Sequence, residues 1–230
     1  MCEFCTAHGE GQKWYLEMKN YAEELLHEEL SAEQQEIVGA TNRLEWNLSF
    51  FEEVVLPAIT GVQAPEEEEE PSSTEAAEAE PSEEELLARR KVSHFGQVLP
   101  LEDVEAVVDL VDSITRLPCG CRFFTTGKTD KRYCFGLGFD KLGILGKFPD
   151  AASSLEVLER DEAKEIFRQY DDEGLMHSIW TGVTPYTAGL CNCDHDCVAY
   201  RLYIEERGSP RFFRAEYICQ VDWDLCSGCK

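Results

Sequence analysis

Cysteines are the residues of this chain that could carry chemistry, and they lie in groups. The 230-residue sequence contains 11 of them. Two thiolates on a tight turn can point both sulfurs at one metal about 2.3 Å away. Soft thiolate ligands select zinc, Cu(I) or iron–sulfur clusters over ions that prefer oxygen. We therefore interpret the groups as metal ligands, because a disulfide framework would need an oxidising compartment that nothing in the sequence indicates.

The central group combines six cysteines from two distant segments, which only the fold can bring together. Four thiolates suffice for one four-iron cluster, and the others could serve a second site or surround the first. Arg122 follows the C-x-C pair and could offset the negative charge of a thiolate-bound cluster, or be an exposed loop charge; His195 is a possible ligand or neighbour. The predicted ligands are Cys119, Cys121, Cys134, Cys191, Cys193 and Cys197.

Each end of the chain carries a further C-x2-C pair. Cys2 and Cys5 are followed by His8, and Cys226 and Cys229 lie just before the last residue. The two pairs together would suit a four-thiolate zinc or iron site, but nearly the whole chain separates them. The N-terminal pair could instead be free thiols. The second pair is spaced like the opening of a bacterial ferredoxin motif, whose later cysteines would fall beyond the last residue.

Several segments form a specific arrangement of motifs: Cys2–Gly11 with Trp14–Leu16, Leu117–Arg122, Tyr133–Gly136, Glu162–Ile166, Glu173–Trp180, Leu190–Cys197 and Val221–Cys229. Together they resemble a large family of prokaryotic 4Fe-4S ferredoxin-like proteins. The resemblance implies iron–sulfur binding and one-electron transfer in the cytoplasm of an anaerobe. It also implies that the chain stops within a C-terminal ferredoxin module.

Hydrophobic periodicity predicts the elements that would position these cysteines. Apolar residues recur at helical spacing over residues 13–30 and 32–56, and Pro57 is expected to end the second helix. Further along the chain, the pattern predicts helices over 101–114, over 155–172 with Gly174 as its cap, and over 198–206, and strands within 211–222.

These elements predict an α+β protein in four parts. Residues 1–60 would form a helical N-terminal hairpin, whose apolar faces could also mediate a homo-oligomer. Residues 61–85 hold 11 acidic residues and no basic one, which predicts a solvated, disordered linker. Residues 86–218 would form a small cysteine-rich α+β domain, and residues 219–230 the start of a truncated ferredoxin module.

Charge and hydropathy exclude several classes of protein. The net charge is −25, of which −14 remains on the 205 residues outside the linker, so nucleic acid and anionic lipid are unfavourable partners. No stretch approaches the roughly 18 apolar residues of a membrane span, and no signal peptide is evident, which indicates the cytoplasm. We expect an electron carrier with redox partner proteins rather than an enzyme; the alternative is a zinc-stabilised interaction module without redox activity.

Overall fold

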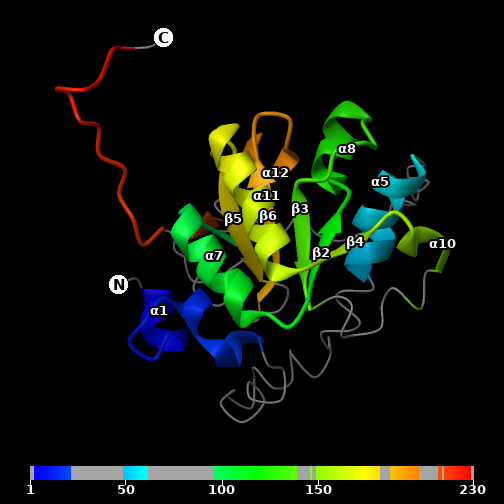
Figure 1. The fold of residues 1–230 in the computed structure, drawn as a ribbon, viewed down its shortest axis with the longest axis horizontal. Coiled ribbons are helices and arrows are strands. Elements are labelled where there is room, and N and C mark those ends of the chain that lie inside the picture. Colours follow the sequence, from blue (N-terminus) through cyan, green and yellow to red (C-terminus); the bar gives the residue numbers. More distant parts are fainter. Residues whose placement is uncertain are drawn as a thin grey trace, which may run out of the picture.

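One sheet forms the centre of the fold (Figure 1) in the computed structural model, which describes residues 3–21, 49–61, 96–138, 146, 149–181, 187–201, 212–213 and 215–228. The strand order is β4-β2-β3-β6-β5-β1-β7, and every neighbouring pair is antiparallel except β1 with β7. The strands are β1 (Gly96–Val98), β2 (Ile114–Leu117), β3 (Cys134–Leu137), β4 (Glu156–Leu158), β5 (Met176–Thr181), β6 (Thr187–Cys193) and β7 (Phe212–Phe213). Helices accompany this sheet, so the predicted α+β class is confirmed at that level.

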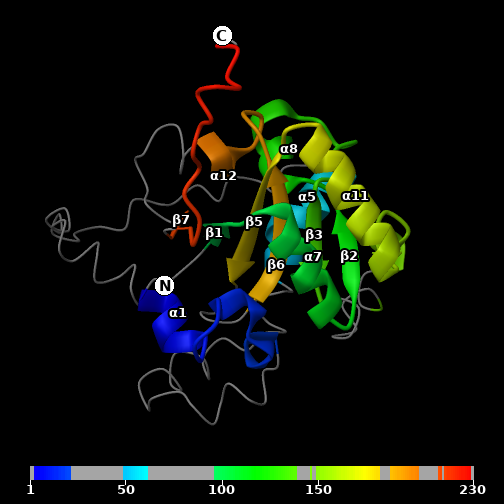
Figure 2. The ribbon, with the colours of Figure 1, turned by 60° about the vertical axis from the view of Figure 1, so that its left-hand side comes forward.

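Helices α7 (Leu101–Leu110) and α11 (Arg160–Asp172) cover one face of the sheet (Figures 1 and 2). Val107 and Phe167 are fully buried there together with Phe135 of β3. Because side chains alternate between the two faces of a strand, the residues on either side of Phe135 face the other way. The cysteine that begins β3 therefore belongs to the face away from α7 and α11.

That second face is covered by α8 (Gly120–Thr126), α12 (Val198–Tyr200) and a helical segment over 49–61. Phe51 and Val55 of this segment are fully buried and pack in one cluster with Leu117 and Leu155. The cluster includes Cys134 as a half-buried member. The segment before the acidic stretch thus rests on the face of the sheet that carries the cysteines.

Pro57 does not end this helix, contrary to the prediction. A π-helical turn, η3 (Phe51–Val55), runs into α5 (Leu56–Thr60), and Gly61 closes the helix with a left-handed φ of 70°. Proline lacks the N–H that would continue the α-helical bonding. The wider π turn just before it, in which the Leu56 N–H bonds to the Phe51 carbonyl, accommodates the missing donor.

The N-terminal residues pack into the same core as the sheet. After α1 (Glu3–His8), the chain forms two short 3₁₀ turns, η1 (Trp14–Leu16) and η2 (Met18–Tyr21), so the α-helix predicted to begin at residue 13 is wrong over this stretch. The Trp14 indole donates to the Gln97 side chain at 2.5 Å. Trp14 is therefore fully buried in the core although it does not lie on the predicted α-helix.

Several predicted boundaries shift because strands take up part of the predicted helices. The 101–114 helix ends at Leu110, since β2 begins at Ile114, and the 155–172 helix begins at Arg160, since β4 precedes it. Gly174 has the left-handed φ, 80°, that its predicted cap position requires. The strands predicted within 211–222 reduce to β7.

Parts of the predictions fall outside the described residues. These are residues 22–48, nearly all of the predicted linker over 61–85, and residues 202–206. No helix in the described ranges is long and apolar enough to cross a membrane. The remaining short helix is α10 (Pro149–Ala152).

Candidate metal centre

The six central cysteines meet between α8, α12 and strands β3 and β6. The antiparallel register of β3 and β6 places Cys134 directly opposite Cys191. Cys193 lies two residues further along β6 and so on the same face. The C-x-C pair lies at the start of α8, which covers this face: Cys119 immediately precedes the helix and Cys121 lies within it. The β-ladder and one short helix therefore unite two segments that are distant in the sequence.

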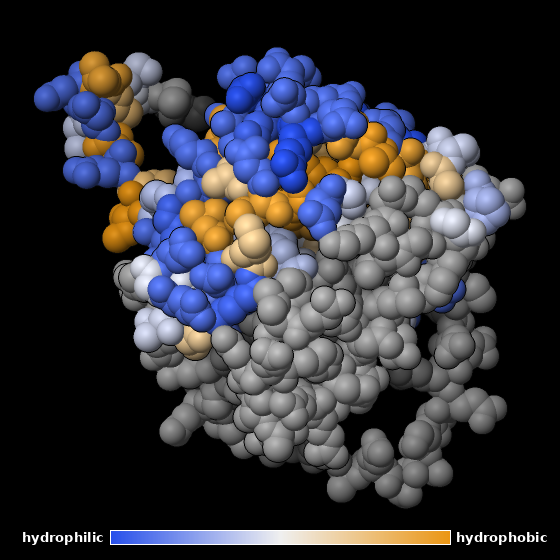
Figure 3. All heavy atoms as spheres, turned by 60° about the horizontal axis from the view of Figure 1, so that its bottom comes forward, coloured by the Kyte–Doolittle hydropathy of each residue, from blue (hydrophilic) through white to orange (hydrophobic). Residues whose placement is uncertain are grey.

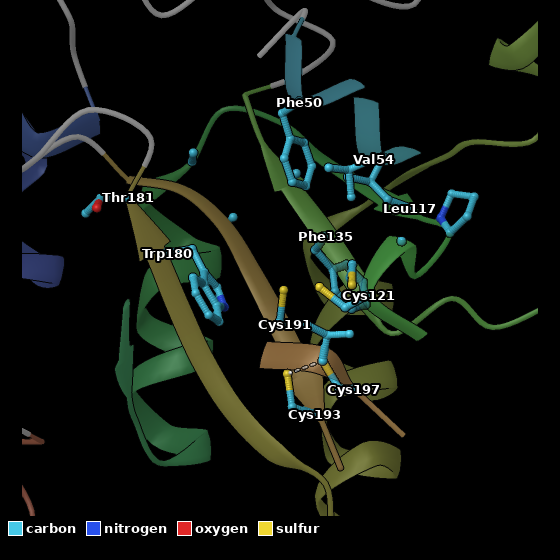
Figure 4. Close-up of a pocket in the computed structure, with 17 residues that line it drawn as sticks. Phe50, Val54, Leu117, Cys121, Phe135, Trp180, Thr181, Cys191, Cys193 and Cys197 are labelled. Atoms are coloured by element: carbon cyan, nitrogen blue, oxygen red, sulfur yellow. Dashed lines mark hydrogen bonds between the residues drawn. The ribbon is translucent and has the colours of Figure 1, made fainter. Parts of the chain in front are cut away.

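Hydrogen bonds join the six thiols into a continuous row. The sulfur atoms of Cys119 and Cys134 are 3.6 Å apart, and those of Cys193 and Cys197 are 3.5 Å apart. Figure 4 shows the second of these contacts as a dashed line. The order along the row is Cys119, Cys134, Cys191, Cys193, Cys197 and Cys121.

Contact and burial raise the pKa of five thiols in this row, those of Cys119, Cys121, Cys134, Cys191 and Cys193. For Cys119 and Cys121 the main cause is the hydrogen bond to a neighbouring thiol, followed by burial. For Cys134, Cys191 and Cys193 one thiol–thiol bond lowers the pKa, but the bond to the next thiol and burial outweigh it. These five raised pKa values favour the protonated thiols at neutral pH, so a metal that bound here would have to displace the protons.

Arg122 lies where the sequence suggested, beside the cysteine row, and not as an exposed loop charge. Its side chain is almost fully buried, at 2% exposure for the residue. The guanidinium is 3.5 Å from the sulfur of Cys119 and 2.9 Å from the Asp194 carboxylate, and it stacks on the Tyr133 ring. Burial would lower its pKa, but the partners Asp194 and Cys119 raise it. A permanent positive charge thus lies against one end of the thiol row.

Backbone groups also face the first sulfur of the row. The Tyr133 N–H donates to the Cys119 sulfur at 2.9 Å and lowers the pKa of that thiol, as does Arg122. Asn192, which is fully buried, accepts from Arg122 through its carbonyl oxygen and donates through its side chain to the Tyr133 carbonyl. Sequence reasoning missed Asn192; its position between two cysteines was the available signal.

A cavity of about 260 Å³ adjoins the row, and five of the six thiols line it. The exception is Cys119. Figure 4 shows the labelled thiols gathered at one end, Phe50 and Val54 at the other, and Trp180 beside the thiols. These walls are apolar and come from the helical segment over 49–61 and from β5. Nothing in the spacing of Phe50 and Val54 could have assigned them to the centre.

Gly120 allows the helical segment to lie directly on the C-x-C pair. A Cβ atom at this position would lie 2.2 Å from a Val54 methyl carbon and 2.7 Å from the Val54 carbonyl oxygen. Real Cβ atoms do not approach backbone oxygen so closely, so only glycine fits between the two cysteines without moving the helix. The glycine of the C-G-C sequence therefore lets the helical segment cover the two cysteines.

The terminal candidates are not assembled in the same way. Cys5 is buried and donates from its sulfur to a Glu216 carboxylate oxygen at 3.2 Å, and His8 is half-buried at the end of α1. Cys226 is exposed near the end of the chain. His195 lies in an exposed loop with its ring against Tyr200. Cys2 and Cys229 lie outside the described residues.

The described residues contain no group of three or more His, Cys, Asp or Glu side chains that could hold a metal ion as they stand. The central thiols form a row along a cavity wall rather than converging on one point. In comparisons with known proteins, no family model, no curated protein and no solved structure matches the chain.

Proposed function

We propose that the chain is a ferredoxin-like iron–sulfur protein that transfers single electrons and holds a 4Fe-4S cluster on four of the six central thiols. The observation that carries the proposal is the cavity: five thiols line one end of an apolar space much larger than a metal ion needs. A four-iron cluster takes four cysteine thiolates and brings its own sulfides. A row of thiols along a cavity suits such a group better than it suits one ion.

The surroundings of Cys119 supply what a thiolate-bound cluster requires. A cluster with four thiolates is negatively charged, and hydrogen bonds and charges at its sulfurs set its potential. Arg122 and the Tyr133 N–H both reach the Cys119 sulfur. Charge and N–H donation at one ligand stabilise the reduced, more negative state and raise the potential.

The proposed setting follows from the resemblance and the charge of the chain. It is the cytoplasm of an anaerobe, with redox proteins as partners, and the net charge of −25 favours partners with a basic docking face. The finer architecture belongs to the same proposal. It comprises a helical N-terminal part that can pair with a second copy, an acidic linker, a cysteine-rich domain, and a ferredoxin module that begins at residue 219.

A zinc-stabilised interaction module is the second candidate, and one observation favours it. In a tetrahedral site with zinc–sulfur bonds of 2.3 Å, neighbouring sulfurs lie about 3.8 Å apart. The two sulfur pairs at 3.5 and 3.6 Å are close to that separation. Pairs of thiols in the row are thus spaced as ligands of one ion.

Anaerobic purification of the full chain separates the two candidates. Iron, acid-labile sulfide and zinc are measured per chain, and electron paramagnetic resonance is recorded after reduction with dithionite. The expected result is about four irons and four sulfides per chain, with a signal that appears on reduction. Stoichiometric zinc without iron, in a colourless protein that dithionite does not change, would establish the second candidate instead.

A further inference from the structure

Two glycines lie opposite each other in the floor of the cavity, one step along the sheet from the thiols. Cys134 pairs with Cys191, and two residues further along the strands Gly136 pairs with Gly189. Side chains two residues apart point to the same face, so the glycine pair continues the surface on which the thiols lie. Trp180 of β5 is the next residue across from Gly189. All five residues line the cavity.

Neither position has the left-handed φ that only glycine adopts readily. Both residues lie within strands, and neither is among the described glycines with positive φ. Glycine weakens a strand interior, and it often marks a place where a ligand approaches the backbone closely. Two opposed glycines in neighbouring strands therefore indicate a place where a ligand can approach the sheet closely.

A side chain at Gly189 would project into that space. Only the Phe135 carbonyl oxygen, at 3.0 Å, lies within 4 Å of the place that its Cβ would take. Apart from the neighbours of Gly189 in the chain, no side chain lies within 4 Å of this Cβ position, whereas a Cβ at Gly120 would lie 2.2 Å from a Val54 methyl carbon. The space beside Gly189 thus belongs to the cavity, which Gly136 also lines.

We infer that Gly136 and Gly189 make the centre specific for a polynuclear cluster over a single metal ion. This inference rests on the proposed iron–sulfur function. A single tetrahedral ion sits among its four sulfurs and needs no room beyond them. A four-iron core must lie beside the thiol row with its own sulfides, on the glycine floor and under the apolar walls of Phe50 and Val54.

The test compares cluster binding with single-ion binding in the same variants of the full chain. Gly189→Ala and Gly189→Val add one and three carbon atoms to the floor without touching a thiol. Gly146→Ala is the matched control, because Gly146 is exposed and nothing lies within 4 Å of its Cβ position. Each protein is reconstituted anaerobically with ferrous iron and sulfide, and separately titrated with cobalt(II), whose thiolate charge-transfer band reports a tetrahedral ion.

The expected result is a selective loss of the cluster. Gly189→Val lowers iron and sulfide per chain at least about tenfold, Gly189→Ala lowers them less, and both keep the wild-type cobalt(II) band. The control matches the wild type in both assays. Equal iron and sulfide in Gly189→Val and wild type would overturn the inference while the proposed function stands. Loss of cobalt(II) binding together with iron would also overturn it, because the glycine would then be structural. A wild type without iron and sulfide would remove the proposed function itself.

Discussion

The central and the terminal cysteines have similar spacings in the sequence but lie in different surroundings. Cys134 and Cys191 are opposed by the register of two strands, so their positions depend on the whole sheet. Cys226 follows a turn in which its N–H bonds to the Asp222 carbonyl, and the segment around it is exposed. Short spacing brings two sulfurs near each other, but only a ladder between distant segments assembles six.

The terminal segment is anchored by a carboxylate and its partners. The buried Asp103 accepts from Tyr15 at 2.7 Å, from Tyr217 at 2.9 Å and from Lys13 at 2.7 Å. Figure 3 shows the segment beyond this anchor standing away from the molecule at the upper left. It exposes the hydrophobic side chains of Ile218, Trp223 and Leu225. The described residues 218–228 thus follow an anchor at Tyr217 and are exposed to solvent.

The largest expected effect follows from removing one central thiol. Cys134 bonds to both Cys119 and Cys191, so Cys134→Ser interrupts the row in its middle. We expect metal bound per chain to fall at least about tenfold, since thiolates are the proposed ligands. Cys226→Ser is the matched control, with metal content at the wild-type value. Equal losses from the two variants, measured by elemental analysis of the purified proteins, would remove the distinction between the two regions.

The next effect concerns the pH dependence of the metal-free protein. The pKa of the Cys121 thiol is raised well above its ordinary value of 9.0 by its bond to Cys197 and by burial. Above pH 9 the unfolded chain loses this proton and the folded chain keeps it. The folded state then binds more protons, so the free energy of unfolding falls as pH rises, whereas below pH 9 the contribution is complete.

Urea denaturation of the metal-free protein between pH 7 and pH 10.5 measures this loss. The Cys121→Ser variant should show a slope smaller by about 1.4 kcal/mol per pH unit above pH 9, since one titrating thiol is gone. Cys226→Ser serves as the control, because Cys226 belongs to the exposed tail and not to the row. A wild-type stability that is constant from pH 7 to 10.5 would contradict the prediction.

The sequence allowed the gathering of the six central cysteines to be predicted, but not the walls of the cavity beside them. The six central cysteines can be recognised from their short spacings, and all six lie in the row. Phe50 and Val54 could not be recognised as walls of the cavity, because they reach it only through the packing of their helix on the sheet. The prediction that the helix ends at Pro57 was wrong because one π turn compensates for the N–H that proline lacks. The helix predicted over 101–114 was too long because Ile114, a β-branched residue, fits both an apolar helical stripe and the start of a strand.

The smallest expected effect tests the anchor of the terminal region. Tyr217→Phe removes the hydroxyl that donates to Asp103 and accepts from Lys13, and leaves the ring on which the Lys13 ammonium lies. Since Tyr217 is 46% exposed, water replaces part of what is lost, and the free energy of unfolding should fall by about 1 kcal/mol. Amide hydrogen exchange should become faster over residues 215–217, while metal content and cluster spectra stay unchanged. If the variant also lost central metal, the anchor would have to support the thiol row through α7, and the two regions would be one cooperative unit.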